Sequence, residues 1–260
     1  MKKDFTTAIY KELIQTFISN DYQLITVKDY FEKNHLDKIV ILRHDIDLLP
    51  KNALIMAKIE NYFGITGSYY FRSIPESWDK NIVKKIMQMG HEIGYHYETM
   101  DQANGNIDEA WNLFRMYLDK MRKITEINTI CMHGSPKSNF DNKEIWKKYD
   151  YKRLGIIGEA YNDIDFNKIF YLTDTGRRWD GWKVSIRDKV PQQNDWLIEG
   201  LVYNSTHDII KAIKENQLPN QIVLNAHPQR WYDKTYPWLK ELIFQNIKNL
   251  IKRLLIYTKQ

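Results

Sequence analysis

Short apolar runs that alternate with amphipathic segments constrain the fold of this chain more than any other feature of its sequence. Residues 39–42 have the continuous apolar pattern of a buried strand. Residues 50–64 follow with helical periodicity, and Pro50 and Gly64 are typical of the first and last positions of a helix. Repeated strand and helix patterns of this kind indicate βα units and a parallel sheet.

The same alternation continues along most of the chain. The expected strands lie at 38–47, 66–73, 91–98, 127–135, 168–176 and 221–228. The expected helices lie at 6–19, 50–64, 79–90, 107–124, 141–149, 205–216 and from about 237 onward, with Asp141 as an N-cap. No Gly-, Ser- or Pro-rich linker interrupts these segments. Residues 1–260 are therefore predicted to form one domain, in which the N- and C-terminal helices pack on a barrel.

Polar residues stand at the C-terminal ends of five of the expected strands. They are Asp45 and Asp47, His96, His133, Asp174 and His227. In a parallel α/β barrel these strand ends converge on one rim, and that rim is where active sites are built. The sequence therefore predicts an α/β barrel of about seven parallel strands with helices outside and a functional site on the rim.

Composition excludes several classes of protein. Lys and Arg are spread along the chain, which carries a net charge of +5, so nucleic-acid binding is not predicted. Cys131 is the only cysteine, which leaves no intrachain disulfide and no thiolate metal cluster. No run approaches the roughly 18 apolar residues that a membrane span requires. The first residues also lack the apolar core of a signal peptide, so a cytoplasmic protein is expected.

The aromatic residues and the last helix each have two interpretations. The eight Trp and 17 Tyr either fill the core, which we favour, or stack on the apolar faces of sugar rings. The last helix has an apolar stripe with basic residues beside it, formed by Leu239, Leu242, Ile243, Ile247, Leu250, Ile251 and Leu254. A basic amphipathic helix lies either on a membrane surface or against the body of its own protein. We expect it to cover the barrel flank.

The segment "RHDID", residues 43–47, has the most pronounced chemical character. Arg43, Asp45 and Asp47 alternate, so in a strand they share one face. Two carboxylates on one face repel unless a cation or a proton lies between them. One of them is therefore predicted to bind a divalent metal and the other to act as a base. The alternative for Asp47 is a helix cap, because it lies three residues before Pro50.

Histidines and a further carboxylate supply the rest of the candidate site. His96 and Glu98 alternate onto one face of the expected strand 91–98, whereas His91 at its start is interpreted as structural. His133 ends the next strand along the chain and precedes a Gly-Ser-Pro turn. His227, at the end of the last strand, is a candidate general acid, because a histidine near a carboxylate serves that role near neutral pH.

The order of these motifs resembles that of a known family. "RHDID" (43–47), "GHEIGYH" (90–96), an Asp-containing turn at 174 and the late "AHP" (226–228) are similar to the motifs of the polysaccharide deacetylases of carbohydrate esterase family 4, the NodB-homology domain. The resemblance covers about residues 38–232. It is strongest to a divergent branch whose first motif reads Arg-His-Asp-x-Asp, found among bacterial surface-polysaccharide proteins.

The resemblance implies a distorted (β/α) barrel that removes N- or O-acetyl groups from sugars with a divalent metal, usually zinc. It assigns the catalytic base to Asp45 and the metal to Asp47 and His96. The family's first motif has two adjacent aspartates, whereas Ile46 separates them in this chain. A second histidine four residues after His96 is replaced by Met100. Methionine is a soft ligand and a poor partner for a hydrolytic zinc.

Two interpretations of the changed motif remain open. In the first, His133 supplies the missing nitrogen, which gives Asp47, His96 and His133 plus one open position. In the second, Met100 marks a metal-free site. Within the resemblance His227 is the general acid and Asp174 its charge partner or a substrate contact. The remaining predicted substrate-binding or orienting residues are Arg43, Glu98, Trp179 and Trp231.

Three functions are therefore considered. The first is a metal-dependent hydrolase that deacetylates a bacterial surface glycan or its precursor. The second is a catalytically inactive member of the same fold that binds carbohydrate or acts as a scaffold in glycan assembly. The third is another metal hydrolase, such as an amidohydrolase that acts on a small substrate. The retained Asp45, Asp47 and His227 favour the first, because a binding module needs neither a base nor an acid.

Overall fold

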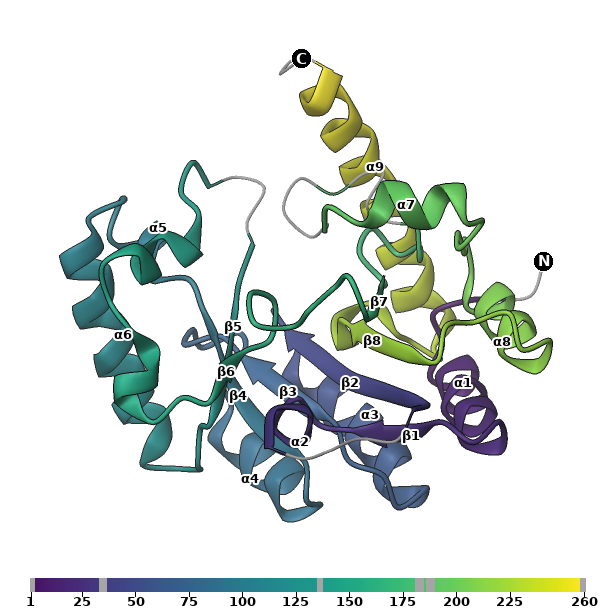
Figure 1. Cartoon of the computed structure of the whole chain (residues 1–260), viewed down its shortest axis with the longest axis horizontal. Helices are drawn as coiled ribbons and strands as arrows, with labels where there is room; N and C mark the ends of the chain where they lie inside the picture. The colour runs from purple at the N-terminus through teal and green to yellow at the C-terminus, as the bar shows by residue number, and fades with distance from the viewer. Residues whose placement is uncertain (1–2, 33–36, 135–137, 181–184, 186–189, 258–260) are drawn as a thin grey trace.

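A curled sheet of parallel strands forms the centre of the computed structural model, which describes residues 3–32, 37–134, 138–180, 185 and 190–257 (Figure 1). Its strands are β1 (Gln23–Ile25), β2 (Ile39–Ile46), β3 (Ser68–Phe71), β4 (Glu92–Tyr97), β5 (Thr129–Met132), β6 (Gly158–Glu159), β7 (Phe170–Thr173) and β8 (Gln221–Ala226). Seven of them follow the order β6-β5-β4-β3-β2-β8-β7, and β1 also pairs with β2. The predicted distorted barrel of about seven parallel strands with helices outside is confirmed.

The long strand β2 pairs with three other strands along different parts of its length. Its first residues, Ile39–Ile41, pair with β1, whereas its last residues, Arg43–Ile46, pair with β3. Its other edge pairs with β8 from Ile39 to His44. Because neighbouring strands pair with different stretches of β2, the sheet curls around it (Figure 1).

Helices lie between successive strands and at both ends of the chain. They are α1 (Thr7–Ser19), α2 (Val27–Glu32), α3 (Pro50–Tyr62), α4 (Lys80–Gln88), α5 (Thr99–Gln102), α6 (Ile107–Arg122), α7 (Gln193–Ile198), α8 (Thr206–Lys214) and α9 (Thr235–Tyr257). Short 3₁₀ helices are η1 (Asn142–Lys147), η2 (Tyr151–Leu154) and η4 (Pro228–Arg230). Asp141 caps η1, as expected, but the segment predicted as an α-helix is a 3₁₀ helix. No helix of the described chain is long and apolar enough to cross a membrane.

Alternation along β2 decides which side chains reach the interior of the curled sheet. Ile39 and Ile41 belong to the hydrophobic cluster inside the sheet, whereas Val40 and Leu42 pack in an outer cluster together with residues of α1, α3 and α8. Successive strand residues face opposite sides, so Arg43 and Asp45 continue the inward row. The alternation along the strand therefore also sets the direction of Arg43 and Asp45, the first candidate site residues.

His44, on the outer face of β2, belongs to a fully buried polar group. The Nε2 atom of His44 lies 3.0 Å from Oε1 of Glu60, which also accepts a 2.6 Å hydrogen bond from the hydroxyl of Tyr10. His91 lies 3.5 Å from the other Glu60 oxygen, and its Nε2 lies 3.0 Å from the carbonyl of Ala57. This arrangement joins α1, α3, β2 and the residue before β4, in agreement with the structural role predicted for His91.

Replacing Glu60 by alanine is expected to destabilise the protein by about 3 kcal/mol. The substitution removes the 2.6 Å hydrogen bond from Tyr10 and the buried contacts of the carboxylate with His44 and His91, and removal of one partner of a buried charge pair costs about 3–5 kcal/mol. Urea denaturation of wild type and Glu60→Ala measures the difference in the free energy of unfolding. A change below about 1 kcal/mol, the size of an ordinary exposed contact, would contradict the structural role of this group.

The same carboxylate is expected to contribute to acid unfolding. Burial raises the pKa of Glu60, but His44, His91 and Tyr10 together lower it more, so the net pKa lies below the ordinary 4.5. A depressed carboxyl pKa stabilises the folded protein above the unfolded value, and this stability is lost as the pH falls through the folded pKa. The free energy of unfolding should therefore decline less steeply below pH 4.5 in Glu60→Gln than in wild type.

The last helix departs from the sequence-based expectation. The stripe predicted to cover the barrel flank includes Leu239, Ile243, Ile247, Leu250 and Ile251, which remain 47–60% exposed. Among residues 235–252 of α9, whose side chains the structure describes, the two buried ones are polar, Gln245 and Asn249. Asn249 donates a 2.8 Å hydrogen bond to the carbonyl of Gly176. The helix thus contacts the body through hydrogen bonds, and most of the apolar stripe that was expected to cover the barrel flank is exposed.

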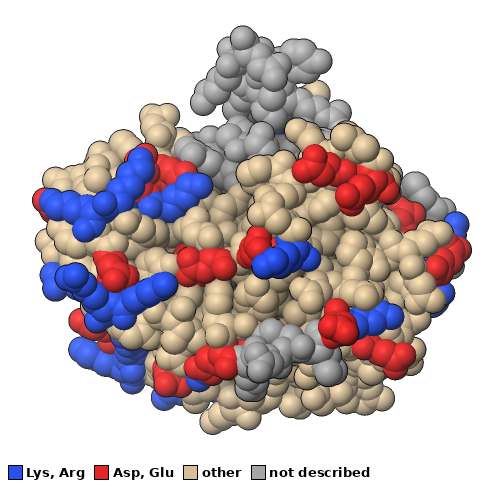
Figure 2. All heavy atoms as spheres, viewed as in Figure 1, with Lys and Arg blue, Asp and Glu red and all other residues tan. Residues whose placement is uncertain are grey.

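Charge is mixed over the surface of the molecule. Figure 2 shows acidic and basic side chains side by side over the face viewed in Figure 1. A strong long-range field arises where charges of one sign gather in one place. This face presents both signs.

Candidate functional site

Three of the predicted site residues meet at the carboxyl ends of β2, β4 and β5. Asp47 directly follows β2, His96 lies near the end of β4, and His133 directly follows β5. The Oδ1 atom of Asp47 lies 3.1 Å from Nδ1 of His133 and 3.7 Å from Nε2 of His96. The two imidazole nitrogens are 3.3 Å apart. One carboxylate oxygen and two imidazole nitrogens therefore converge on one point.

These distances fit the ligand shell of a small divalent metal. Zinc binds imidazole nitrogen at about 2.0–2.1 Å, so two ligand atoms of a tetrahedral site are separated by about 3.3 Å. The three separations of 3.1, 3.3 and 3.7 Å lie around that value. Two nitrogens and one carboxylate oxygen are also the donor types typical of a catalytic zinc with one open position. The residues present thus fit the metal that the sequence suggested.

Neighbouring side chains hold Asp47 in place. Its second oxygen, Oδ2, accepts a 2.8 Å hydrogen bond from Nε2 of Gln229, and its backbone carbonyl accepts one from Arg72. Burial alone raises the pKa of Asp47, but the adjacent His133 and His96 hold the net pKa well below its usual value. Asp47 is therefore an anion aimed at the two histidines, and it makes no helix-capping hydrogen bond at the start of α3, which begins after Leu49.

Each of the two histidines has a partner at its second ring nitrogen, which orients the ring. Nδ1 of His96 lies 3.0 Å from the carbonyl oxygen of Cys131, which fixes Nε2 as the nitrogen that faces Asp47. Nε2 of His133 lies 3.9 Å from Oε2 of Glu98. Glu98 is in turn held by Arg72 through two hydrogen bonds of 3.1 and 2.6 Å. A histidine whose far nitrogen faces a carbonyl or a carboxylate is the usual arrangement of a metal ligand.

Met100, at the position where the family has its second histidine, lies away from this point. It belongs to the short helix α5, is 1% exposed and packs in the hydrophobic cluster on the outer side of β3 and β4. Its backbone N–H donates a 3.0 Å hydrogen bond to Asn142. The residue that replaces the family's second histidine is thus a core residue, and the nitrogen near Asp47 comes from His133.

Asp45 is held differently from Asp47. Arg43 donates two hydrogen bonds to it, Nε to Oδ1 at 2.9 Å and Nη2 to Oδ2 at 2.6 Å, and Asn225 donates a third at 3.0 Å. Burial raises the pKa of the Asp45 carboxyl, but the Arg43 guanidinium, His96 and His227 together lower it more, so the net pKa lies well below its usual range. Asp45 is an ionised carboxylate with a fixed orientation.

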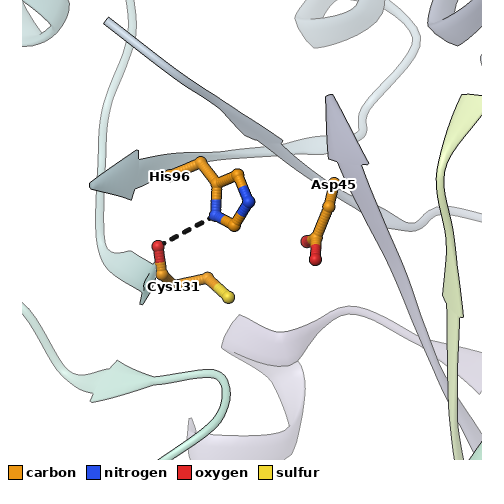
Figure 3. A group of neighbouring side chains, drawn as sticks. All are labelled: Asp45, His96 and Cys131. Atoms are coloured by element: carbon orange, nitrogen blue, oxygen red, sulfur yellow. Dashed lines mark hydrogen bonds between the residues drawn. The ribbon is translucent and has the colours of Figure 1, made fainter. Parts of the chain in front are cut away.

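A second group of ligand-type side chains shares His96. Figure 3 shows its members, Asp45, His96 and Cys131, inside the sheet. Their potential ligand atoms all lie within 4.8 Å of one another. Here Asp45 is already neutralised by Arg43, and the His96 Nδ1 atom is directed at the Cys131 carbonyl. A metal in this group would have to displace a bidentate ion pair, whereas Asp47 forms no ion pair with an Arg or Lys side chain in the described structure. The first group is therefore the better metal site.

His227 and Asp174 form a pair at the ends of β8 and β7. Nδ1 of the His227 ring lies 2.6 Å from Oδ1 of Asp174, and the backbone N–H of His227 donates a 2.9 Å hydrogen bond to Oδ2. Arg230 and Trp231 donate further hydrogen bonds to the same carboxylate, at 2.5 and 2.8 Å. Burial raises the pKa of Asp174, but Arg230 and His227 together lower it by more, so the net pKa is depressed. The carboxylate binds one ring nitrogen and leaves Nε2 for the site.

The two tryptophans predicted at the site, Trp179 and Trp231, are buried in the core. Trp231 is 1% exposed and orients Asp174, so it supports the site from the core without contacting solvent. Trp179 is 4% exposed, donates to the hydroxyl of Thr206 and packs near Phe5 and Trp231. A side chain enclosed in this way has no free face on which to stack a sugar. The turn after β7 points Trp179 inward beside Trp231, and its role as a substrate-binding or orienting residue stays a prediction.

An open groove begins beside the metal-ligand group. Its lining includes Arg72, Glu98, Asp101, His133, Asn139 and Phe140. Polar groups with one aromatic ring are the kind of lining that a carbohydrate requires.

Sequence reasoning missed several residues of this site. Asn225 lies on the inward row of β8 two residues before His227, so strand alternation gives a signal for it. Gln229, Arg230 and Arg72 follow strand ends in irregular or 3₁₀ backbone, where no periodicity predicts the direction of a side chain.

No protein-family model and no curated protein matches the chain. Solved structures similar to it include a family 4 carbohydrate esterase from Bacillus anthracis, at 11% identity and a TM-score of 0.42 over 93% of this chain and 86% of that one. The peptidoglycan deacetylase PdaC from Bacillus subtilis, as its D285S mutant, is 12% identical over 84% and 97%, with a TM-score of 0.40. A pseudoenzyme of the same esterase family from Bacillus anthracis is 11% identical over 83% and 62%, with a TM-score of 0.41.

The chain spans 62–64% of the length of the pseudoenzyme chains that it matches. A likeness of this degree says nothing about what this chain binds or catalyses.

Proposed function

We propose that this protein is a metal-dependent deacetylase that hydrolyses an N- or O-acetyl group on a bacterial surface glycan or its precursor. The observation that carries the proposal is the convergence of Asp47, His96 and His133 at 3.1–3.7 Å from one another. The neighbouring Asp45 and His227, each oriented by its own partner, supply a base and an acid. The motif order described above supports acetylated sugars as the substrate class.

In this proposal a divalent ion, with zinc the best match to the donor set, supplies Lewis-acid activation of water and of the acetyl carbonyl. Asp45 accepts the proton of the attacking water, and Arg43 and Asn225 keep its oxygens in a fixed orientation during the transfer. His227 donates a proton from Nε2 to the leaving sugar nitrogen or oxygen. Asp174 holds the opposite nitrogen and stabilises the charged imidazolium.

Metal stoichiometry followed by a deacetylation assay tests the function. The purified chain is titrated with zinc, cobalt and nickel by calorimetry and is then incubated with acetylated amino-sugar oligomers and acetylated xylan, with acetate release measured. About one equivalent of bound metal and metal-dependent release of acetate are expected. A chain that binds metal but releases no acetate would favour another hydrolase. A chain that binds no metal but retains sugar would be a carbohydrate-binding member of the fold.

Replacing Glu98 by glutamine is expected to weaken metal binding about 10- to 100-fold, the usual effect of removing an outer partner of a histidine ligand. Glu98 is the carboxylate behind Nε2 of His133, and Arg72 holds it in place. Calorimetric metal titration of wild type and Glu98→Gln measures the change. Asp108→Asn is a matched control, because Asp108 pairs with Lys148 at an exposed position. Equal metal affinity in wild type and Glu98→Gln would show that Glu98 serves another purpose.

A further inference from the structure

The helix α9 presents its apolar side chains to solvent. Leu239, Ile243, Ile247 and Leu250 recur at intervals of three or four residues and are each about half exposed. Phe244 and Ile251, at 51% each, widen the same face, and Tyr236 at its start is 79% exposed. In a helix, positions at these intervals form one continuous stripe. A stripe of this width is normally turned toward a protein core or another apolar phase.

Polar contacts fix the opposite face of α9 to the body. Asn249 donates to the carbonyl of Gly176, and Gln245 donates to Asn249. At the start of the helix, Nη1 of Arg177 donates a 2.7 Å hydrogen bond to the carbonyl of Trp238. These contacts set the rotation of the helix about its axis, so the apolar stripe cannot turn inward while they persist. In Figure 1 the later turns of α9 extend away from the sheet.

The charges of α9 indicate what covers the stripe. Lys240 and Lys248 are exposed, whereas Glu241, the one acidic residue of positions 235–252, interacts with Arg230 and Arg177 on the body as well as with Lys248. An apolar stripe accompanied by exposed lysines is complementary to an anionic lipid surface, where each basic residue contributes about 1 kcal/mol. Pairing of the stripe with that of a second copy would instead bring lysines together at the edge of an apolar contact, which is unfavourable.

We propose that α9 lies in the interface of an anionic lipid bilayer, with its apolar stripe inserted among the acyl chains and its lysines at the headgroups. The helix begins eight residues after His227, at the carboxyl end of the sheet, so docking brings that rim close to the membrane surface. A lipid-linked glycan would then be the substrate class, and this last step rests on the proposed function.

Vesicle flotation with the full chain tests the proposal without any activity measurement. The probes are vesicles of phosphatidylcholine with phosphatidylglycerol, and vesicles of phosphatidylcholine alone, each at low and high salt. We expect binding to the anionic vesicles that weakens with salt. The double variant Ile243→Asp/Ile247→Asp should bind at least about tenfold less, because two apolar side chains are lost from the buried stripe.

The matched control is Leu197→Asp/Ile198→Asp, which changes two exposed apolar residues of α7 and should leave binding unaltered. Far-ultraviolet circular dichroism and metal titration confirm that both variants are folded. Absence of binding to anionic vesicles, or equal binding to both kinds of vesicle, would overturn the proposal. Sedimentation that shows a concentration-dependent dimer lost in Ile243→Asp/Ile247→Asp would also overturn it, by assigning the stripe to a second copy.

Discussion

His133→Ala is expected to lower the affinity for zinc more than about 100-fold, beyond the effect of losing an outer partner, and to reduce deacetylation to background. The variant leaves only Asp47 and His96, and two protein ligands do not hold a hydrolytic metal against water. Gln229, which holds Asp47, remains in place, so the loss is specific to the missing nitrogen. Calorimetric titration and elemental analysis after dialysis measure the bound metal.

Two controls distinguish this expectation from general damage. His207→Ala removes a histidine of α8, which packs on α1, and should retain one equivalent of metal. Met100→Leu changes the residue at the family's ligand position and should also retain it, because Met100 packs in the core and a volume-conserving swap is tolerated there. Retention of the metal by His133→Ala together with its loss from Met100→Leu would replace His133 by Met100 in the site.

The placement of the predicted side chains on one rim follows from the regularity of the strands. In β2, the apolar residues Ile39 and Ile41 fill the interior, and the two-residue period carries the same direction forward to Arg43 and Asp45. Parallel pairing of β4 with β5 sets His96 beside Cys131, so His133, two residues later, reaches the same rim. Each of these directions depends only on alternation and register, which a single sequence expresses.

The parts that sequence reasoning missed depend on backbone without a period. Met100 is four residues after His96, but the chain turns into α5 after Glu98, and that turn directs Met100 into the core. Trp179 follows a turn in which Gly176 and Arg177 both have positive φ, and it points inward for the same reason. The orientation of α9 depends on Asn249 and Gly176, which are 73 residues apart. Such contacts arise only in the folded chain.

Asp45→Asn is expected to reduce kcat by about 10²–10⁴-fold, the contribution of a positioned general base, while the metal stays bound. The amide keeps the shape of the carboxylate and one oxygen that accepts from Arg43, but it cannot take a proton from water. Acetate release at saturating substrate, with metal content measured on the same samples, tests this. A variant that keeps more than a tenth of wild-type kcat would assign the base elsewhere, and one that loses its metal would make Asp45 a ligand.

The pH profile of wild type gives an independent test of the same carboxylate. Burial raises the pKa of Asp45, but Arg43, His96 and His227 together lower it more, so the group is already ionised well below the ordinary aspartate range. Catalysis should therefore show no loss from protonation of Asp45 as the pH falls from neutral to about 4. Replacing Arg43 by methionine removes the charge that depresses the pKa, and burial then raises it. An acid limb should appear in Arg43→Met within the range where wild type shows none. Coincident acid limbs in the two proteins would mean that the ion pair does not govern the base.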